Sequence, residues 1–331
     1  MNTLQLGNSD LVVTRIGLGC MPIGGSWDQT PLQEVTRKQA MLTVRAALDQ
    51  GIDFYDHADI YCRGKSEQAF ADVWNEVPNL RGKIILQSKC GIRFADDPVA
   101  GAPHSGAPHR FDFSYEHIVN SVDGILKRLQ TDYLDVLLLH RPDPLVEPDE
   151  VAKAFDGLKQ SGKVRHFGVS NHTAAQLALL QKYINQPIVA NQIAFNVMHT
   201  HMLDEGIIFN QTKPSVITRN EGTIEYCRLH NITLQAWGPL AWGRVTGRPG
   251  ITLTEAETKT AQLVADMARE KGVSPEAILV AWVLRHPAKI QAIIGSTKPD
   301  RIAASCQADN VTLTREEWYR LFIAGRGENL P

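Results

Sequence analysis

The sequence lacks the features that mark secreted, membrane-spanning and nucleic-acid-binding proteins. None of its apolar runs approaches the roughly 18 residues of a membrane-spanning helix, and residues 1–10 lack the basic flank and apolar core of a signal peptide. The 331 residues carry 34 Lys and Arg against 36 Asp and Glu, a formal net charge of -2 that creates no general attraction for phosphate backbones. We therefore expect a cytoplasmic protein that binds neither membrane nor nucleic acid.

Cysteine is also scarce. The 5 cysteines are odd in number and form no Cys-x-x-Cys pair, so the sequence suggests neither a disulfide framework nor a tetrahedral zinc cage. His199 and His201 have the look of a metal-binding pair, but they follow the nearest strand candidate well beyond its end. We therefore expect no metal site and a reducing compartment.

What the sequence has in abundance is an alternation of short apolar runs with amphipathic segments. This alternation is typical of repeated β-α units and a parallel sheet. Apolar residues spaced three or four apart predict sheet-facing helix positions at Met41, Val44 and Leu48, at Ile118, Val122, Ile125 and Leu129, at Val151, Phe155 and Leu158, and at Leu177, Leu180 and Ile184. Eight strand candidates can be counted, namely 16–19, 53–56, 83–89, 133–140, 164–170, 189–192, 233–237 and 291–295.

Eight such units without an internal linker favour an α/β fold in which residues 1–331 form a single (β/α)₈ barrel domain. The alternative is a doubly wound open sheet with a second domain, but no G-x-G-x-x-G follows the first strand candidate. Outside the eightfold repeat we expect an N-terminal β-hairpin from residues 3–6 and 11–13. We also expect an extra helix over 274–286, with Ser274 as N-cap and Pro275 in the first turn.

Three long connections interrupt the repeat. They cover residues 91–113, 195–220 and 239–256, after the third, sixth and seventh strand candidates. In a barrel such connections rise from the C-terminal face, which carries the functional site. We expect that face to hold the chemistry.

Four chemically active side chains follow neighbouring strand candidates: Asp56, Tyr61, Lys89 and His140. A lysine at the end of an apolar strand is costly without a carboxylate partner, and Asp56 is the natural one. For any one of these residues alone, a structural ion pair or hydrogen bond explains its presence equally well. The functional interpretation depends on all four together.

The four residues fit the reduction of a carbonyl group. A Lys89 ammonium about 4 Å from Tyr61 is worth roughly 4 kcal/mol at an effective dielectric constant of about 20. That energy would lower the pKa of the phenol by up to about 3 units before desolvation opposes it. A neutral His140 would donate a hydrogen bond to the substrate oxygen.

At these motifs the sequence resembles the aldo-keto reductase family, from about Leu4 to about Arg320. The run Leu18-Gly19-Cys20-Met21 is similar to the family's first-strand motif, and residues 51–61 are similar to its signature around the catalytic Asp and Tyr. Lys89 and His140 match the other two members of its tetrad. The resemblance implies a (β/α)₈ barrel that binds NADP(H) without a Rossmann motif and transfers hydride to an aldehyde or ketone, with Tyr61 as general acid.

The resemblance also implies cofactor contacts. Ser170, Asn171 and Gln192 match the residues that hold the carboxamide, Trp237 matches the ring-stacking aromatic, and residues 294–301 match the grip on the 2′-phosphate. A helix start with nearby Ser, Lys and Arg suits a phosphate on grounds of dipole and charge. The implied set is Gly19, Cys20, Met21, Asp56, Ser170, Asn171, Gln192, Trp237, Gly238, Leu240, Trp242, Gly295, Ser296, Thr297, Lys298 and Arg301.

The sequence departs from the family pattern at several positions. Ala304 and Ser305 stand where Glu or Gln and then Asn commonly contact the adenine, so NAD(H) stays possible. Trp237 replaces the more usual Tyr, and His57 replaces a small Thr or Ser. None of these changes removes a proton-transfer group.

Loop aromatics are candidates for the substrate pocket. Trp27 and Phe94 would line it after the first and third strands, with Trp242 as a further candidate after the seventh, although local packing explains such aromatics equally well. The expected substrate is a small carbonyl compound or alcohol. Two alternatives stay open at this point: a sugar or alcohol dehydrogenase that uses NAD(P) in the oxidative direction, and a non-catalytic nicotinamide-binding regulatory subunit.

Overall fold

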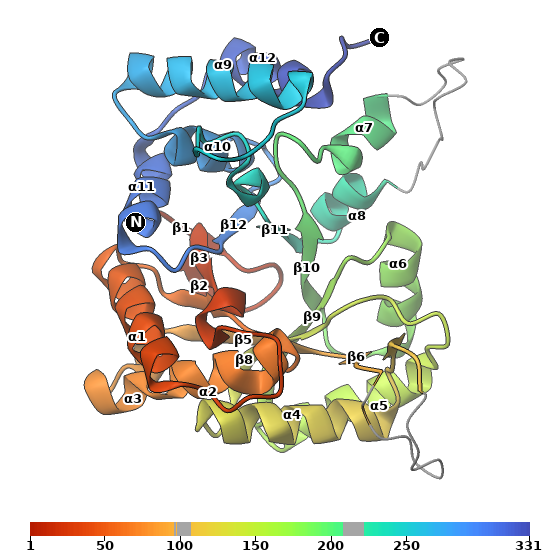
Figure 1. The fold of residues 1–331 in the computed structure, drawn as a ribbon. Coiled ribbons are helices and arrows are strands. Elements are labelled where there is room, and N and C mark those ends of the chain that lie inside the picture. Colours follow the sequence, from red (N-terminus) through yellow and green to blue (C-terminus); the bar gives the residue numbers. More distant parts are fainter. Residues whose placement is uncertain (96, 98–106, 208–221) are drawn as a thin grey trace. The chain divides into compact units, whose positions relative to one another are not determined.

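Eight parallel strands form a closed barrel. The computed structural model describes residues 1–95, 97, 107–207 and 222–331, and its barrel has the strand order β10-β11-β12-β3-β4-β5-β8-β9 (Figure 1). The predicted (β/α)₈ fold is therefore confirmed, and no strand boundary differs from the prediction by more than 2 residues. The barrel strands are β3 (Ile16–Gly19), β4 (Phe54–Asp56), β5 (Ile85–Cys90), β8 (Leu134–Leu139), β9 (Val164–Ser170), β10 (Ile188–Ala194), β11 (Thr233–Trp237) and β12 (Gln291–Ile294).

Two antiparallel hairpins lie outside the barrel. The predicted N-terminal hairpin is present as β1 (Thr3–Gln5) and β2 (Val12–Thr14). A second hairpin pairs β6 (Ile92–Arg93) with β7 (Arg110–Phe111) inside the connection predicted as a loop over 91–113. Its strands have only two residues each, which is too short to produce a periodic signal in the sequence.

The chain divides into two compact units. The first contains Met1–Gly19, Leu42–Phe54 and Gln192–Pro331, and the second contains Cys20–Met41 and Tyr55–Asn191. The expectation that residues 1–331 form one domain stays a prediction. Residues 208–220, the end of the second predicted long connection, lie outside the described part of the chain.

In the second unit, β8 pairs with β5 on one side and β9 on the other, and helices cover these strands. The predicted buried stripe of α4 is confirmed, because Ile118, Val122, Ile125 and Leu129 are all fully buried. The helices are η1 (Met21–Gly24), η2 (Tyr61–Gly64), α2 (Lys65–Ala71), α3 (Val73–Glu76), η3 (Arg81–Lys83), α4 (Tyr115–Leu129), α5 (Pro148–Gln160) and α6 (Ala174–Tyr183).

The other predicted stripes agree at most positions. Those of α5 and α6 are buried, although Ile184 is the residue that ends α6 rather than part of it. In α1 (Glu34–Asp49), which contributes to both units, Met41 and Val44 are buried and Leu48 is half-buried.

In the first unit, the predicted extra helix is the apolar α10 (Pro275–Leu284). Its N-cap Ser274 accepts a hydrogen bond from the Ala277 N–H, as expected. Trp282 of α10 stacks on Trp318 of α12 at 5.1 Å, and each indole N–H donates to the other residue's carbonyl. The remaining helices of this unit are α7 (His201–Ile207), α8 (Thr223–Leu229), η4 (Ala241–Gly243), α9 (Glu255–Lys271), α11 (Pro299–Cys306), η5 (Gln307–Asn310) and α12 (Arg315–Arg326).

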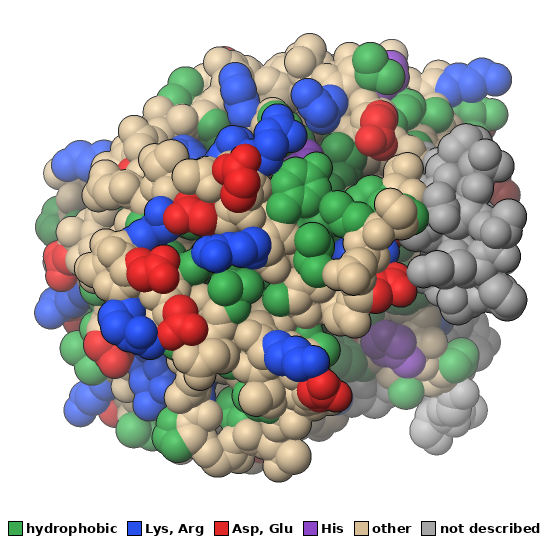
Figure 2. Space-filling model, turned by 90° about the horizontal axis from the view of Figure 1, so that it is seen from above, with side chains coloured by type: hydrophobic (Ala, Val, Ile, Leu, Met, Phe, Trp, Pro, Cys, Tyr) green, Lys and Arg blue, Asp and Glu red, His purple; other side chains and the backbone are tan. Residues whose placement is uncertain are grey.

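The surface carries both signs of charge. On the face drawn in Figure 2, Lys and Arg side chains are interspersed with Asp and Glu. No helix within the described ranges is long and apolar enough to cross a membrane.

Gly325 marks the closest backbone approach in the first unit. A Cβ at this position of α12 would lie 1.7 Å from the carbonyl oxygen of Val197, so Gly325→Ala would force the helix away. We expect a loss of about 3 kcal/mol in the free energy of unfolding. Gly157 on the exposed face of α5 has no atom within 4 Å of such a Cβ, and Gly157→Ala is expected to add about 0.5–1 kcal/mol. Urea unfolding would measure both, and equal effects would contradict the packing argument.

Candidate active site

The ammonium of Lys89 is the centre of the site in the second unit. Its Nζ lies 2.7 Å from both carboxylate oxygens of Asp56, 2.9 Å from the carbonyl oxygen of His57 and 3.0 Å from the Tyr61 hydroxyl. Lys89 itself is 0% exposed. The predicted pairing of Lys89 with Asp56 is therefore present, and it brings Tyr61 to the same ammonium.

Backbone hydrogen bonds hold these groups in place beyond the ends of the strands. The His57 N–H donates to Gln87, and the Asp59 N–H donates to the carbonyl oxygen of Lys89 itself. On the next strand, the His140 N–H donates to Cys90. The segment that carries Tyr61 is thus tied to the strand that carries Lys89.

The pKa of Tyr61 corrects one expectation. Burial raises this pKa above its usual value, the charge of Lys89 opposes the rise, and the Asp56 carboxylate adds to it. The ammonium does act in the predicted direction, but removing the phenolate from water costs more than one cation returns. Tyr61 therefore keeps its proton at neutral pH, which is the form that a proton donor needs.

Lys89 stays charged for a related reason. Burial acts to lower its pKa, but Asp56 and Tyr61 together raise it above the ordinary value for lysine. A buried ammonium with three hydrogens and a carboxylate partner is stable as an ion. The site therefore has a permanent cation next to a neutral phenol.

His140 is neutral, as expected. Burial and the nearby charges of Lys89 and Arg141 hold its pKa well below the usual value. Its ring lies edge-on to the Tyr61 ring at 5.7 Å, and its Nδ1 has no hydrogen-bond partner in the described part of the chain. A neutral imidazole carries one N–H donor, which can be directed at a substrate oxygen beside the phenol.

His57 contributes its backbone rather than its ring. The side chain is fully buried against Phe70, with ring centroids 4.7 Å apart, and neither ring nitrogen has a partner among the described residues. Burial, assisted by the charge of Lys89, lowers the pKa of His57 to about 3. The histidine that departs from the family pattern is thus an uncharged packing group, and its carbonyl is an acceptor for Lys89.

Other predicted residues of the second unit lie at the ends of neighbouring strands. Asn171, with a left-handed φ of 61°, donates from Nδ2 to the Ser170 hydroxyl at 2.8 Å and to the His140 carbonyl at 3.4 Å. Cys20 is buried, and its backbone N–H donates to the carbonyl oxygen of Asp56. Met21 beside it is exposed. Their proposed contacts with a cofactor stay predictions.

In the first unit, Gly19 ends β3 and Trp237 ends β11. The Trp237 ring meets the exposed Trp242 edge-on at 6.1 Å. Between them, Gly238 has a φ of 65°, its carbonyl accepts from Asn196, and Leu240 is buried. Gln192 is also buried and donates to Gln235.

The predicted phosphate grip of the first unit lies at the start of α11. Gly295 is exposed with open space around it, the Ser296 hydroxyl accepts from the Lys298 N–H, and Lys298 is the N-cap of the helix. The carbonyl of Thr297 accepts from Thr43. Arg301 follows in the first turn.

Arg248 is a candidate that the sequence analysis missed. Its Nε is buried without a hydrogen-bond partner among the described residues. Burial lowers its pKa, the charge of Arg301 lowers it further, and the Glu276 carboxylate opposes both. A guanidinium whose buried N–H has no partner among the described residues, close to a second guanidinium, fits an anionic group such as a phosphate. The signal was the run Gly243-Arg244-Val245-Thr246-Gly247-Arg248, in which Arg244 pairs with Glu257.

Arg63 connects the two predicted substrate-pocket aromatics. Its guanidinium lies 4.3 Å from the centre of the Phe94 ring, and its Nε donates to the Trp27 carbonyl at 3.0 Å. The side chain of Trp27 is 44% exposed. This geometry is compatible with a pocket wall, and the assignment stays a prediction.

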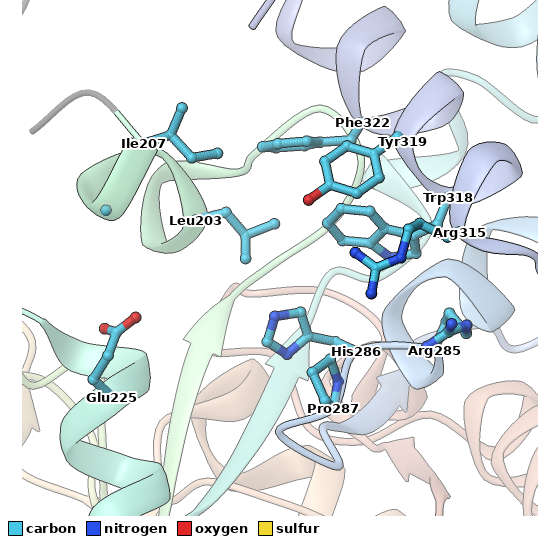
Figure 3. Close-up of a pocket in the computed structure, with 11 residues that line it drawn as sticks. Leu203, Ile207, Glu225, Arg285, His286, Pro287, Arg315, Trp318, Tyr319 and Phe322 are labelled. Carbon is cyan, nitrogen blue, oxygen red and sulfur yellow. The ribbon is translucent and has the colours of Figure 1, made fainter. Parts of the chain in front are cut away.

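A separate pocket in the first unit contains none of the predicted site residues. It has a volume of about 530 Å³ and lies between α7, α8, the end of α10 and α12. In Figure 3, Trp318, Tyr319, Arg315 and His286 surround its open space. Nor does the described part of the chain contain a cluster of three metal-ligating side chains, and its five cysteines are buried free thiols.

The chain is similar to proteins of known family. Residues 15–324 match the aldo/keto reductase family. The chain belongs to this family. This aldo/keto reductase is 37% identical to the oxidoreductase YcsN of Bacillus subtilis (strain 168) over 86% of its length and 87% of the relative's. It is 32% identical to a 6-dehydroglucose reductase of Agrobacterium fabrum over 97% of each chain.

Solved structures agree on the fold of this aldo/keto reductase. A glycerol dehydrogenase from Gluconobacter oxydans superposes with a TM-score of 0.79 at 23% identity, covering 99% of this chain and 97% of that one. A thermostable aldo-keto reductase crystallised with the inhibitor epalrestat gives 0.75 at 23% identity, covering 98% and 100%. The protein is an oxidoreductase with the barrel of its family.

The buried ion pair predicts a stability effect that needs no assay of activity. Lys89→Met would leave the Asp56 carboxylate buried without its cation, so we expect the free energy of unfolding to fall by about 3–5 kcal/mol. Adding Asp56→Asn should recover part of this loss, because the uncompensated charge is removed. Urea unfolding would measure both variants.

Lys163 gives a matched control for this measurement. It also pairs with an aspartate, Asp123, but the two side chains are 38% and 51% exposed. Lys163→Met should therefore cost less than about 1 kcal/mol. A loss for Lys89→Met no larger than this would show that the buried pair does not stabilise the fold.

Proposed function

We propose that this aldo/keto reductase reduces an aldehyde or ketone to an alcohol, with NADP(H) as the hydride source. The observation that carries the proposal is the Lys89 ammonium, which contacts Asp56 and the hydroxyl of a protonated Tyr61. A proton donor with an adjacent fixed cation is what carbonyl reduction requires, because the substrate oxygen gains negative charge as the carbon accepts hydride.

Each residue of the site has its own role in the proposed reduction. When bound, the reduced nicotinamide would supply the hydride to the carbonyl carbon. The Tyr61 hydroxyl gives its proton to the carbonyl oxygen, which completes the alcohol, and solvent later returns a proton to the phenolate. Lys89 stabilises that transient phenolate at 3.0 Å, while Asp56 keeps Lys89 in place. The His140 N–H orients and polarises the carbonyl group.

The resting protonation of Tyr61 is the form from which reduction starts, whereas oxidation of an alcohol starts from the phenolate. An oxidative dehydrogenase needs a base to accept the proton of an alcohol, and a phenol whose pKa is raised by burial is a poor base at neutral pH. The regulatory-subunit alternative does not require this assembled group of residues. We therefore rank the reductase first and treat the two alternatives as outcomes of the assays below.

The proposed cofactor contacts fall on each unit separately. In the second unit, Ser170 and Asn171 would hold the carboxamide, as the family resemblance implies. In the first unit, Gln192 would join them in this role and Trp237 would stack on the ring. Arg301, Lys298 and Arg248 would bind the 2′-phosphate. The buried Nε of Arg248, which has no hydrogen-bond partner among the described residues, supports this assignment.

The proposed substrate is a small carbonyl compound that contacts Trp27 and Phe94. The name of the Agrobacterium relative records a sugar derivative as its substrate. A panel that contains oxidised sugars, aliphatic aldehydes and aromatic aldehydes would cover the proposed range. Each compound would be tested with NADPH and NADH, and each matching alcohol with NADP and NAD.

Tyr61→Phe tests the proton donor directly. The variant keeps the ring but loses the hydroxyl that Lys89 contacts, so it should fold, bind cofactor and lose about 10²–10⁴-fold in kcat on the best carbonyl substrate. Absorbance of the reduced nicotinamide would measure turnover. A kcat close to that of the wild type would remove Tyr61 from the mechanism.

Arg301→Ala tests the phosphate assignment. A charge-assisted hydrogen bond is worth about 1.5–3 kcal/mol, so the variant should bind NADPH roughly 10–150-fold more weakly. NADH lacks the 2′-phosphate and should be almost unaffected. Quenching of tryptophan fluorescence would give both dissociation constants. Equal changes for the two cofactors, or a wild type that prefers NADH, would contradict the assignment.

A further inference from the structure

The chain makes an unusual turn immediately after Tyr61. Cys62, Arg63 and Gly64 all have left-handed backbone angles, with φ of 49°, 58° and 82°. Two consecutive non-glycine residues in this region are uncommon and cost conformational energy. Such a turn persists only where its surroundings hold it. Residues 62–66, hereafter the Tyr61 turn, have such surroundings.

The Tyr61 turn contacts residues 21–30, which we call the Trp27 loop. Ser66 donates from its hydroxyl to the Met21 carbonyl at 2.9 Å. The Cys62 Sγ lies 3.2 Å from the carbonyl oxygens of Met21 and Gly25. The two segments also touch closely at their backbones, since a Cβ on Gly24 would lie 2.5 Å from the Ser66 nitrogen.

Lys65 makes the largest set of these contacts. Its Nζ lies 3.1 Å from the Ser26 hydroxyl, 3.0 Å from the Asp28 carbonyl oxygen, 3.2 Å from an Asp28 carboxylate oxygen and 3.1 Å from the Thr30 carbonyl oxygen. The residue is only 6% exposed. Four oxygens converge on one buried ammonium, much as they would on a bound metal cation.

The Trp27 loop is folded around the same point. The Asp28 carboxylate oxygen that faces Lys65 also accepts from the Ser26 hydroxyl at 2.9 Å and from the Thr30 N–H at 3.0 Å. The hydroxyls of Thr30 and Ser26, together with Lys65, hold the pKa of Asp28 well below its usual range. The Asp28 carboxylate is therefore charged at neutral pH, where it faces the Lys65 ammonium.

Trp27 stands at the centre of this arrangement, and contacts on both sides of it fix its backbone. Its neighbours Ser26 and Asp28 bind Lys65, and its own carbonyl accepts from Arg63. The residue is 44% exposed. A tryptophan whose backbone is fixed and whose side chain is partly exposed can contact a ligand.

We propose that Lys65 is a positioning residue for the carbonyl substrate: its ammonium folds the Trp27 loop and thereby places the Trp27 ring where the substrate contacts it. Lys65 touches no reacting atom and acts through Trp27. The proposal rests on the proposed carbonyl reductase function, from which it takes its kinetic measurement. It adds a residue that determines substrate affinity, distinct from Tyr61 and Lys89, which carry out the chemistry.

A double-mutant cycle tests the dependence on Trp27. An aromatic contact is worth about 1.4 kcal/mol, so Lys65→Met and Trp27→Ala should each raise the KM for an aromatic aldehyde about 10-fold. The double variant should show no larger change than Trp27→Ala alone, because the effects of coupled residues do not add. The kcat should change less than about threefold, and the dissociation constant for NADPH should not change.

Chemical rescue tests the role of the charge. Lys65→Ala removes the ammonium together with three methylenes, and propylammonium replaces the missing atoms. Propylammonium should restore the KM toward the wild-type value, whereas tetramethylammonium, which cannot donate hydrogen bonds, should not. Lys38→Met is the matched control, since Lys38 belongs to the same unit but its side chain is 74% exposed. It should leave the KM unchanged.

Hydrogen–deuterium exchange of the Trp27 loop, residues 21–30, gives a measurement that needs no turnover. Faster exchange in Lys65→Met, with unchanged exchange in α4 and α5, would show that the cation folds the loop. Ser26→Ala, which removes one of the four oxygens, is the milder variant and should shift both exchange and KM in the same direction.

The outcomes separate the two proposals. If exchange and KM are unchanged in Lys65→Met, or if the double variant shows additive losses, Lys65 does not act through Trp27. If the Trp27 loop exchanges faster in Lys65→Met but the wild-type enzyme reduces no carbonyl compound, the proposed function fails. Lys65 then has a purely structural role.

Discussion

The site depends on one buried cation. Lys89 has no exposed surface, and its ammonium must satisfy its charge and three hydrogens within the protein. Asp56 supplies the opposite charge, the His57 carbonyl supplies a neutral acceptor, and the Tyr61 hydroxyl supplies the last contact. Asp56 is the last residue of β4, and His57 and Tyr61 lie on the segment that follows it. The requirement to solvate one lysine thus fixes the position of the proton donor.

The sequence did not show whether the pKa of Tyr61 is raised or lowered in the folded protein. The order of residues along β4 and β5 identified the partners, because residues at the ends of adjacent parallel strands are neighbours. It did not reveal how completely the phenol is withdrawn from water. Burial outweighs the charge of Lys89 at Tyr61, whereas the partners outweigh burial at Lys89 itself. Such balances depend on the packing of the whole unit.

The fold was more predictable than the site because its signals are local. Most of the strand candidates are short apolar runs, and β3, β9 and β11 have the predicted boundaries. The N-cap of α10 and the buried stripe of α4 likewise follow from residues within a few positions of each other. The hairpin of β6 and β7 and the proximity of Arg248 to Arg301 were missed because they depend on contacts between segments that no periodic pattern connects.

His57 shows how a departure from the family pattern leaves the chemistry intact. The side chains of the neighbours Asp56 and His57 point in different directions. The Asp56 carboxylate contacts the Lys89 ammonium, and the His57 ring contacts Phe70. A large ring in place of a small residue therefore changes the packing of the second unit, while the backbone carbonyl still faces Lys89. Because burial lowers the pKa of the imidazole to about 3, the ring adds no second cation near Lys89 at neutral pH. The presence of His57 in place of a small residue therefore adds no charge to the site.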